Sequence, residues 1–325
     1  MDGEMRRRNR RKHNKNRRDK KGPAIIMVVI LVFVMALIIY KNLEKFVGKS
    51  DNANKNTTET IKKPEETKKN TEEEKPKPEV DKNKQVKGKS YYGMAKEYAY
   101  DTKLVRDIIS GKKENSIGKV VFLTFDDGPN HIITPKILDV LKEKKVPATF
   151  FVVGRLVNDK TKDVLERELK EGHSIALHSY THEYSTLYPN RIAKSEAIIN
   201  EAKKTENALK QVLGEDFKSG CWRYPGGHMS WKNLADADKK LEEMGLSWLD
   251  WNCLNGDAEP KKVRPVDVAG NVKFIENSLN INKVTDVAVV LMHDAESKEL
   301  TAEALPKIIE DRKSTRLNSS HGRRS

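Results

Sequence analysis

Two adjacent aspartates, Asp126 and Asp127, follow directly on an apolar run that ends at Phe125. Adjacent carboxylates repel each other, and a carboxylate that is buried without a partner is costly in free energy. One interpretation is a solvated turn, because the Asp-Gly and Gly-Pro pairs that follow favour turns. The other is a site in which one carboxylate binds a cation while its neighbour acts as a base.

Two histidines four residues apart, His178 and His182, could complete such a site. Such a pair alone is more often surface or packing, but a carboxylate presented by a neighbouring strand favours a metal site. Two imidazoles and one carboxylate leave coordination positions open, which suits catalytic zinc or another divalent cation. The same ligand types hold non-haem iron in oxygenases, but those enzymes have all-β folds. One carboxylate suffices as a ligand, so the other is free to act as the base on water that the metal activates.

The elements that must position these residues alternate between strand and helix. Thr134 caps a helix that has Pro135 at its first position, and amphipathic helices are expected over 159–172 and 191–213. Apolar strand patterns precede, separate and follow them, at 119–125, 148–154, 173–178, 217–225, 246–252 and 287–293. This alternation predicts an α/β fold, a parallel sheet or barrel with helices outside.

Further polar residues close the later strands. Arg223, Asp250 and His293 each end one of them, and in parallel α/β folds chemistry is found at the carboxyl ends of strands. Structural alternatives stay open: Arg223 and Asp250 could form an ion pair at the barrel rim, and His293 could be a satisfied buried histidine. Trp251 could be core, ligand contact or both.

Five short motifs in order carry a resemblance to a known family. They are "TFDDGP", "HSYTH", "RYPGG", "DWN" and "LMH", and the match covers residues 119–310. In order and approximate spacing they resemble the motifs of NodB-homology polysaccharide deacetylases, carbohydrate esterase family 4. The resemblance implies a distorted (β/α)₇ barrel and metal-dependent hydrolysis of N-acetyl groups on amino sugars.

The resemblance also implies roles for the acidic and imidazole groups. Asp126 would be the general base, which Arg223 would orient. His293 would be the general acid that protonates the leaving amine, with Asp250 holding it as the imidazolium. The metal, which we expect to be one zinc ion, would be bound by Asp127, His178 and His182.

The remaining implied roles concern the substrate slot. Leu291 and Trp251 would line the pocket for the acetyl methyl group. Gly226 stands where the family usually has an aromatic residue, and its backbone N–H would contribute to the oxyanion hole. Glycine keeps that N–H but lacks the ring, so the groove contacts here differ from the family pattern.

The segment before the motifs predicts a membrane anchor. Residues 1–22 and 311–325 carry +8 and +4 of the formal charge of +14, which leaves +2 for the rest and argues against nucleic acid as a partner. Residues 23–40 contain no charge and are long enough to span a bilayer as an uncleaved signal anchor, with the basic tail 1–22 in the cytoplasm. We expect a disordered extracellular linker at 41–90 and a short helical lead-in at 91–117, before a catalytic domain at 118–310.

The end of the chain predicts an interrupted domain. Residues 301–310 form an amphipathic helical pattern that changes abruptly to a basic polar string, and "DRKSTRLNSSH" back-translates to a common short-read sequencing adapter. We therefore expect 311–325 to be a sequencing artefact that replaces a final strand, leaving an unpaired barrel edge and an exposed apolar helix face. Two cysteines, Cys221 and Cys253, permit a disulfide without establishing one.

The expected function is an outward-facing, membrane-anchored deacetylase. Because the linker starts at a membrane, N-acetylglucosamine of peptidoglycan is the expected substrate. N-acetylmuramic acid, poly-N-acetylglucosamine and acetylated xylan are alternatives that would use the same residues. The alternative from another functional class is a catalytically silent wall-binding module. Such a module predicts the loss of one or more of five residues, and all five are present: Asp126, Asp127, His178, His182 and His293. The sequence predicts no oligomeric state.

Overall fold

The computed structural model describes the backbone of residues 81–321 and the side chains up to residue 312. No helix in that part is both long and apolar enough to cross a membrane. The predicted anchor at 23–40 and the predicted linker as far as residue 80 lie outside the described residues.

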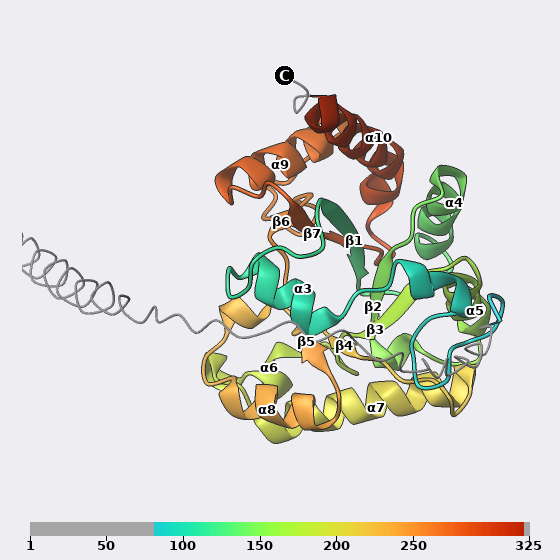
Figure 1. The fold of residues 1–325 in the computed structure, drawn as a ribbon. Coiled ribbons are helices and arrows are strands. Elements are labelled where there is room, and N and C mark those ends of the chain that lie inside the picture. Colours follow the sequence, from blue (N-terminus) through green and yellow to red (C-terminus); the bar gives the residue numbers. More distant parts are fainter. Residues whose placement is uncertain (1–80, 322–325) are drawn as a thin grey trace, which may run out of the picture. The chain divides into compact units, whose positions relative to one another are not determined.

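A curled sheet of seven strands forms the centre of residues 81–321 (Figure 1). Its strand order is β5-β4-β3-β2-β1-β7-β6, and every pairing is parallel. The strands are β1 (Val120–Asp126), β2 (Thr149–Val152), β3 (Ser174–Leu177), β4 (Cys221–Trp222), β5 (Ser247–Trp248), β6 (Cys253–Leu254) and β7 (Val287–His293). The predicted α/β class with a parallel sheet is confirmed.

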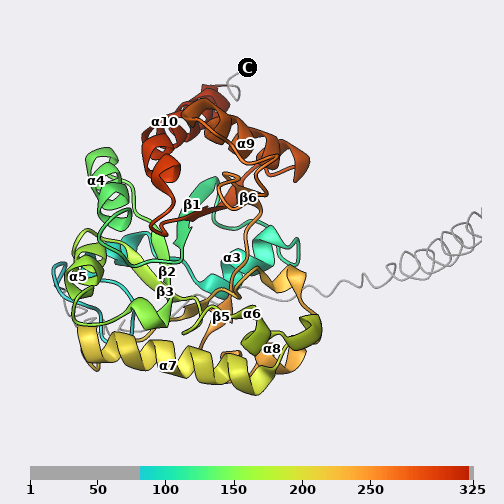
Figure 2. The ribbon, with the colours of Figure 1, turned by 180° about the vertical axis from the view of Figure 1, so that it is seen from behind.

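Helices surround this sheet, most of them on its outer face (Figures 1 and 2). They are α3 (Thr102–Ile109), α4 (Thr134–Lys144), α5 (Lys162–Lys170), α6 (Tyr184–Leu187), α7 (Ser195–Leu213), α8 (Ala235–Glu243), α9 (Val268–Ile281) and α10 (Glu299–His321). Single 3₁₀ turns lie at Gly93–Glu97, Gly154–Leu156, Pro189–Arg191 and His228–Ser230. The helix α3 differs from the others because it contacts both β5 and β7, across the open side of the sheet.

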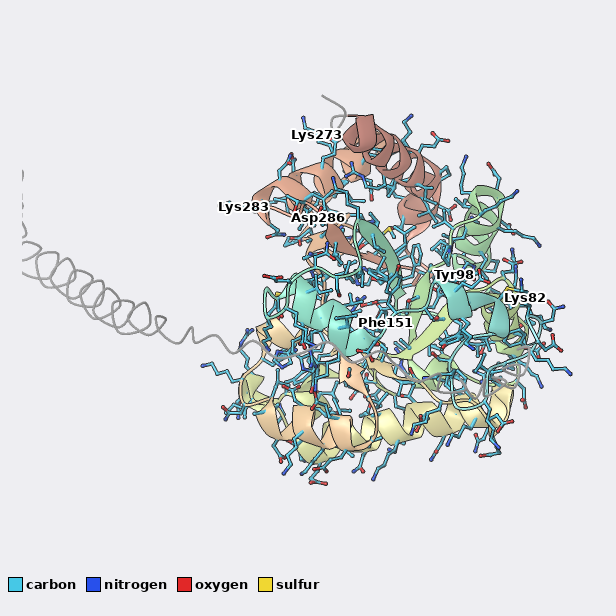
Figure 3. All side chains as sticks on the ribbon, viewed as in Figure 1. Lys82, Tyr98, Phe151, Lys273, Lys283 and Asp286 are labelled. Atoms are coloured by element: carbon cyan, nitrogen blue, oxygen red, sulfur yellow. The ribbon has the colours of Figure 1, made fainter. Side chains whose placement is uncertain are left out.

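Side chains alternate along β1, as a strand requires. Leu123 and Phe125 pack outward into the main core between sheet and helices. Phe122 points the other way, into a second cluster that contains Phe151 and Val289. Figure 3 shows Phe151 near the middle of the molecule, whereas charged side chains such as Lys273 and Lys283 project from its surface. Thr124 and Asp126 are two and four residues beyond Phe122, so their side chains lie on the same, concave face of the sheet.

Residues 81–90 correct the predicted linker, because the structure joins them to the domain. The Ser90 carbonyl accepts a hydrogen bond from the N–H of Ile175, and the Gly88 N–H donates to the Asp216 carbonyl. A short bridge joins Lys89 to Phe217. The segment is poor in apolar residues, so its order comes from backbone pairing that composition does not reveal.

The last helix also differs from expectation. α10 begins at Glu299 and continues to His321. Its apolar face is buried rather than exposed, with Leu305, Ile308 and Ile309 no more than 3% exposed, and the helix packs on α4 and α9. The prediction of an exposed apolar helix face is therefore wrong. The prediction that 311–325 is an artefact stays a prediction.

Candidate active site

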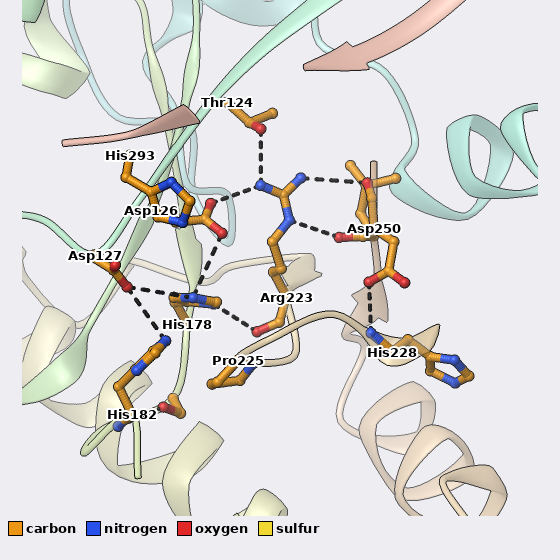
Figure 4. A network of polar contacts seen from close by, with 12 residues as sticks. Thr124, Asp126, Asp127, His178, His182, Arg223, Pro225, His228, Asp250 and His293 are labelled. Carbon is orange, nitrogen blue, oxygen red and sulfur yellow. Dashed lines mark hydrogen bonds and ion pairs between the residues drawn. The ribbon is translucent and has the colours of Figure 1, made fainter. Parts of the chain in front are cut away.

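Three side chains form a cluster suited to a metal ion at the carboxyl end of the sheet (Figure 4). Asp127 follows β1, and His178 and His182 lie in the loop after β3. Asp127 Oδ1 lies 3.7 Å from His178 Nε2 and 3.4 Å from His182 Nε2. Ligand atoms bound tetrahedrally to one zinc ion lie about 3.3–3.6 Å apart, given bonds of about 2.0–2.2 Å. The predicted ligand set is thus brought together.

Two further observations fit a cation at this cluster. Asp127 Oδ1 is buried and has no hydrogen-bond partner among the described residues, so a cation would satisfy an otherwise unpaired acceptor. Burial lowers the pKa of His178 to about 3, which keeps the imidazole neutral, as a metal ligand must be. The carbonyl of Arg223 lies 2.9 Å from His178 Nδ1, which fixes the proton on that nitrogen and leaves Nε2 free.

Asp126 is almost fully buried beside this cluster. Arg223 Nη1 donates to its Oδ1 at 2.7 Å, as the resemblance to the family implied, and the other carboxylate oxygen lies 3.6 Å from His178 Nε2. Burial raises the pKa of Asp126, and the nearby Arg223 charge opposes that effect without cancelling it. A carboxylate with a raised pKa is better suited to accepting a proton than an ordinary aspartate.

Arg223 is completely buried, and its guanidinium is held from several sides. It donates to the Thr124 hydroxyl at 2.9 Å and to the Leu249 carbonyl at 3.0 Å. Its guanidinium carbon lies 3.8 Å above the ring of Phe151, a cation–π contact. These contacts fix the direction from which the arginine reaches Asp126 (Figure 4).

The partner predicted for His293 is wrong. His293 Nδ1 lies 2.7 Å from Asp257 Oδ1, and the His293 N–H donates to Asp257 Oδ2. The Asp250 carboxylate instead accepts the N–H groups of His228 and Met229, and its carbonyl accepts a bond from Arg223.

The unpredicted strand β6 explains this exchange. It pairs Leu254 with Leu291, so the chain that follows β6 runs beside the end of β7, where the Asp257 carboxylate reaches His293. Asp250, in contrast, lies before the strand. A strand of two residues has no periodicity to read, so the only signal for Asp257 was its position four residues beyond Cys253 in the polar stretch that follows "DWN".

The pair makes His293 a strong base and a protonated group at neutral pH. Burial lowers the pKa of His293, but the charge and hydrogen bond of Asp257 outweigh burial and raise that pKa to about 9. The pKa of Asp257 is correspondingly lowered: burial raises it, and His293 outweighs that contribution. Because Asp257 occupies Nδ1, the imidazolium presents Nε2 as its free proton donor.

The predicted substrate slot lies around the glycines of "RYPGG". Gly226 and Gly227 have φ of 78° and 82°, a conformation that favours glycine. A Cβ on Gly227 would lie 2.7 Å from the ring of Trp251, so the indole packs directly on that backbone. Among the described residues, nothing accepts a hydrogen bond from the N–H of Gly226. Leu291 is 6% exposed and contributes a wall rather than an open surface.

Three aromatic residues that the sequence did not single out form an aromatic wall beside the slot: Tyr184, Tyr188 and Trp231. The ring of Tyr184 lies 5.5 Å from His182 and 5.1 Å from Trp231, between centroids, and the residue is 46% exposed. Trp231 stacks on Tyr188 at 4.1 Å and donates to the Pro225 carbonyl.

The aromatic wall occupies the space beside Gly226. A Cβ at that position would lie 3.0 Å from Trp231 Cζ2 and 3.2 Å from the Tyr184 hydroxyl. The rings therefore stand where a larger side chain on residue 226 would extend. In the sequence the only signal for the two tyrosines was the aromatic content of "HEYSTLYP", and Trp231 lies outside that stretch.

The two cysteines are free in this structure, and Cys253 is buried. Burial raises the pKa of Cys221 to about 12 and that of Cys253 to about 11, so neither is a thiolate at neutral pH. They contribute nothing to the chemistry of the site.

Comparison with known proteins gives a consistent picture. The sequence profile described as polysaccharide deacetylase matches residues 113–247. A peptidoglycan-N-acetylglucosamine deacetylase of Bacillus cereus is 34% identical over 184 residues, 57% of this chain and 63% of the relative. The match thus spans under two thirds of that relative's length. A chitooligosaccharide deacetylase of Rhizobium leguminosarum bv. phaseoli is 40% identical over 189 residues, 57% of this chain and 73% of the relative.

A solved structure extends the similarity to nearly a whole chain. The structure of a Streptococcus mutans CE4 esterase is 45% identical in sequence and superposes with a TM-score of 0.69. The match covers 97% of the esterase chain and 73% of this chain. The shared fold, the sequence identity and the clustering of the motif residues agree. This chain belongs to the polysaccharide deacetylase family.

Proposed function

We propose that this protein removes N-acetyl groups from amino sugars of a cell-wall polysaccharide, with N-acetylglucosamine of peptidoglycan as its substrate. The observation that carries the proposal is the joint placement of a buried carboxylate, a protonated imidazole and a metal-binding triad at one end of the sheet. The similarity to the Bacillus cereus enzyme supports the choice of polymer.

A divalent cation, which we propose to be zinc, held by Asp127, His178 and His182 would supply Lewis acidity toward water and toward the acetyl carbonyl. The chain's own residues then divide the remaining work. Asp126 accepts the proton of the attacking water, and Arg223 keeps its carboxylate oriented. The free N–H of Gly226 donates to the carbonyl oxygen as negative charge develops there.

Departure of the amine requires a proton, and His293 donates it from Nε2. Asp257 stabilises the imidazolium before the transfer, because its carboxylate bonds to Nδ1 at 2.7 Å. Trp251 and Leu291 form the apolar slot for the acetyl methyl group. Asp250 acts indirectly. Its carboxylate accepts hydrogen bonds from the backbone N–H groups of His228 and Met229 and so holds their loop in place.

The aromatic wall supplies a surface for a sugar ring. Tyr184 presents a half-exposed ring next to His182, and its hydroxyl makes no hydrogen bond with another described residue. Aromatic rings contribute large apolar contact areas while a phenol adds a polar contact, and both suit the mixed surface of a pyranose. We also propose the arrangement that the sequence favours, a single-pass anchor at 23–40 with the catalytic domain outside the cell.

The test is hydrolysis of defined substrates by the purified protein loaded with zinc. Peptidoglycan fragments and N-acetylglucosamine oligomers are compared, and mass spectrometry identifies which sugar has lost its acetyl group. Loss from N-acetylglucosamine in the peptidoglycan fragments, faster than from the oligomers, is the expected result. Faster reaction of the oligomers would favour the activity named for the Rhizobium relative, and no acetate release from any substrate would refute the proposal.

A further inference from the structure

Glu201, in the middle of α7, is a buried carboxylate outside the motifs. The residue is 5% exposed, and one oxygen, Oε2, accepts three hydrogen bonds. The donors are the N–H of Tyr180 at 2.8 Å, the N–H of Thr181 at 2.6 Å and the Thr181 hydroxyl at 3.0 Å. All three donors lie in the loop between the histidines of the triad.

That loop has a backbone conformation that needs support. Ser179 and His182 have φ of 61° and 59°, in the left-handed region that side chains other than glycine rarely adopt. Such a conformation is costly in free energy for these residues and persists only when the surroundings enforce it. The loop therefore cannot be explained by its own conformational preferences.

The hydrogen bonds of the loop show what enforces it. On one side, the carbonyls of Ser179 and Tyr180 accept the N–H groups of Gly154 and Arg155. Within the loop, the His182 N–H donates to the Ser179 hydroxyl at 2.9 Å. The N–H groups of residues 180 and 181 both donate to the carboxylate of Glu201.

We propose that Glu201 is a positioning residue for the metal site: it holds the loop so that His178 and His182 face Asp127 together. The inference rests on the proposed metal-dependent function. Metal sites depend on such outer partners, whose removal typically costs about 10–100-fold in metal affinity. The role requires a side chain as long as glutamate, so that its acceptor oxygen reaches the N–H groups of residues 180 and 181.

Three substitutions separate this role from a general contribution to folding. Glu201→Ala removes the acceptor, and Glu201→Asp keeps the charge but ends one methylene short of the loop. Glu201→Gln keeps an acceptor oxygen at the same distance. Glu196 on the same helix is the matched control, because its carboxylate pairs with Lys240 and its side chain is 75% exposed.

The experiment measures affinity for Zn²⁺ by competition with a chromophoric chelator, and the visible spectrum of the Co²⁺ form. The thermal midpoint of each metal-free variant is recorded alongside, to show that it is folded. We expect affinity to fall about 10–100-fold in Glu201→Ala and Glu201→Asp, with an altered Co²⁺ spectrum. Glu201→Gln and Glu196→Ala should keep the wild-type spectrum.

The outcomes are distinct. If Glu201→Ala does not fold, Glu201→Asp and Glu201→Gln still decide the question, because both retain a polar group at the buried position. Wild-type affinity and spectrum in folded Glu201→Asp would overturn the inference, as would a Glu201→Gln variant as weak as the aspartate variant. Failure of the wild-type protein to bind zinc would instead refute the proposed metal-dependent function.

Discussion

Replacing Asp257 by asparagine should lower the pH above which catalytic activity is lost. In the proposed mechanism His293 must be protonated to release the amine, so the alkaline limb of the pH–rate profile follows its pKa. That pKa is raised to about 9 because the Asp257 carboxylate, 2.7 Å from Nδ1, outweighs the opposing effect of burial. Asparagine keeps an acceptor for Nδ1–H but removes the charge.

The size of the effect follows from the structure. The rise from 6.5 to about 9 corresponds to about 3 kcal/mol in favour of the imidazolium. Without the charge of Asp257 only burial and the more distant Asp126 and Asp127 remain, so the pKa should return to about 6.5 or lower. At pH 8 the protonated fraction would then fall about 30-fold, whereas at pH 5.5 it would change little.

The assay is kcat against pH for the zinc-loaded wild type, Asp257→Asn and Asp250→Asn. The expected result is a shift of the alkaline limb by about 2.5 pH units or more in Asp257→Asn, with the limb of Asp250→Asn in its wild-type position. Within residues 81–312, the Asp250 carboxylate accepts hydrogen bonds from the backbone N–H groups of His228 and Met229 and from no other group. A shift in Asp250→Asn and none in Asp257→Asn would refute the reasoning and restore the pairing that the motifs implied.

Four other predictions test the site and its surroundings. Asp126→Asn should retain zinc, measured by elemental analysis, yet lose about 10²–10⁴-fold in kcat, because the base is removed and the ligands are not. The double variant His178→Ala, His182→Ala should contain no stoichiometric metal; retention would place the metal elsewhere. Tyr184→Ala should raise KM for oligosaccharides more than it lowers kcat, and an unchanged KM would remove the aromatic wall from substrate binding. Burial, then the charge of Asp294, raises the pKa of Glu168 well above 4.5, so the folded chain binds a proton there that the unfolded chain releases as pH rises. The free energy of unfolding should therefore decrease as pH rises above about 4.5. In Glu168→Gln the thermal midpoint should change less between pH 5 and 8 than it does in the wild type.

Much of the site was predictable because its residues are close in sequence to strand ends. Asp126 and Asp127 close a strand of seven residues, and His178 and His182 follow one whose apolar run is unmistakable. A parallel sheet brings such ends to one edge whatever the details of the helices. The contact of Arg223 with Asp126 was implied only by the resemblance to a family, since 97 positions separate the two residues.

The parts that escaped prediction depend on contacts that leave little mark on the sequence. Asp257 reaches His293 only because β6 pairs with β7, and two residues cannot show a strand pattern. Glu201 lies in an amphipathic helix, where a glutamate is usually a solvated side chain, so its burial had no local signal. Residues 81–90 have the composition of a tether and gain their order from pairing with residues far along the chain.

The unequal strand lengths have a consequence for how this enzyme could vary. β1 and β7 are seven residues long and pair along their whole length, while β4 and β5, on the side of the substrate slot, have two residues each. Amide hydrogen exchange should therefore be slowest around Asp126 and His293 and faster from Trp222 to Trp251, where fewer ladder bonds must open. The acid, the base and the first metal ligand thus belong to the most stable cooperative unit, and Arg223 and the loops of the proposed substrate slot belong to a softer one. Evolution or engineering could remodel sugar preference in the softer unit while the acid, the base and the first metal ligand stay in register.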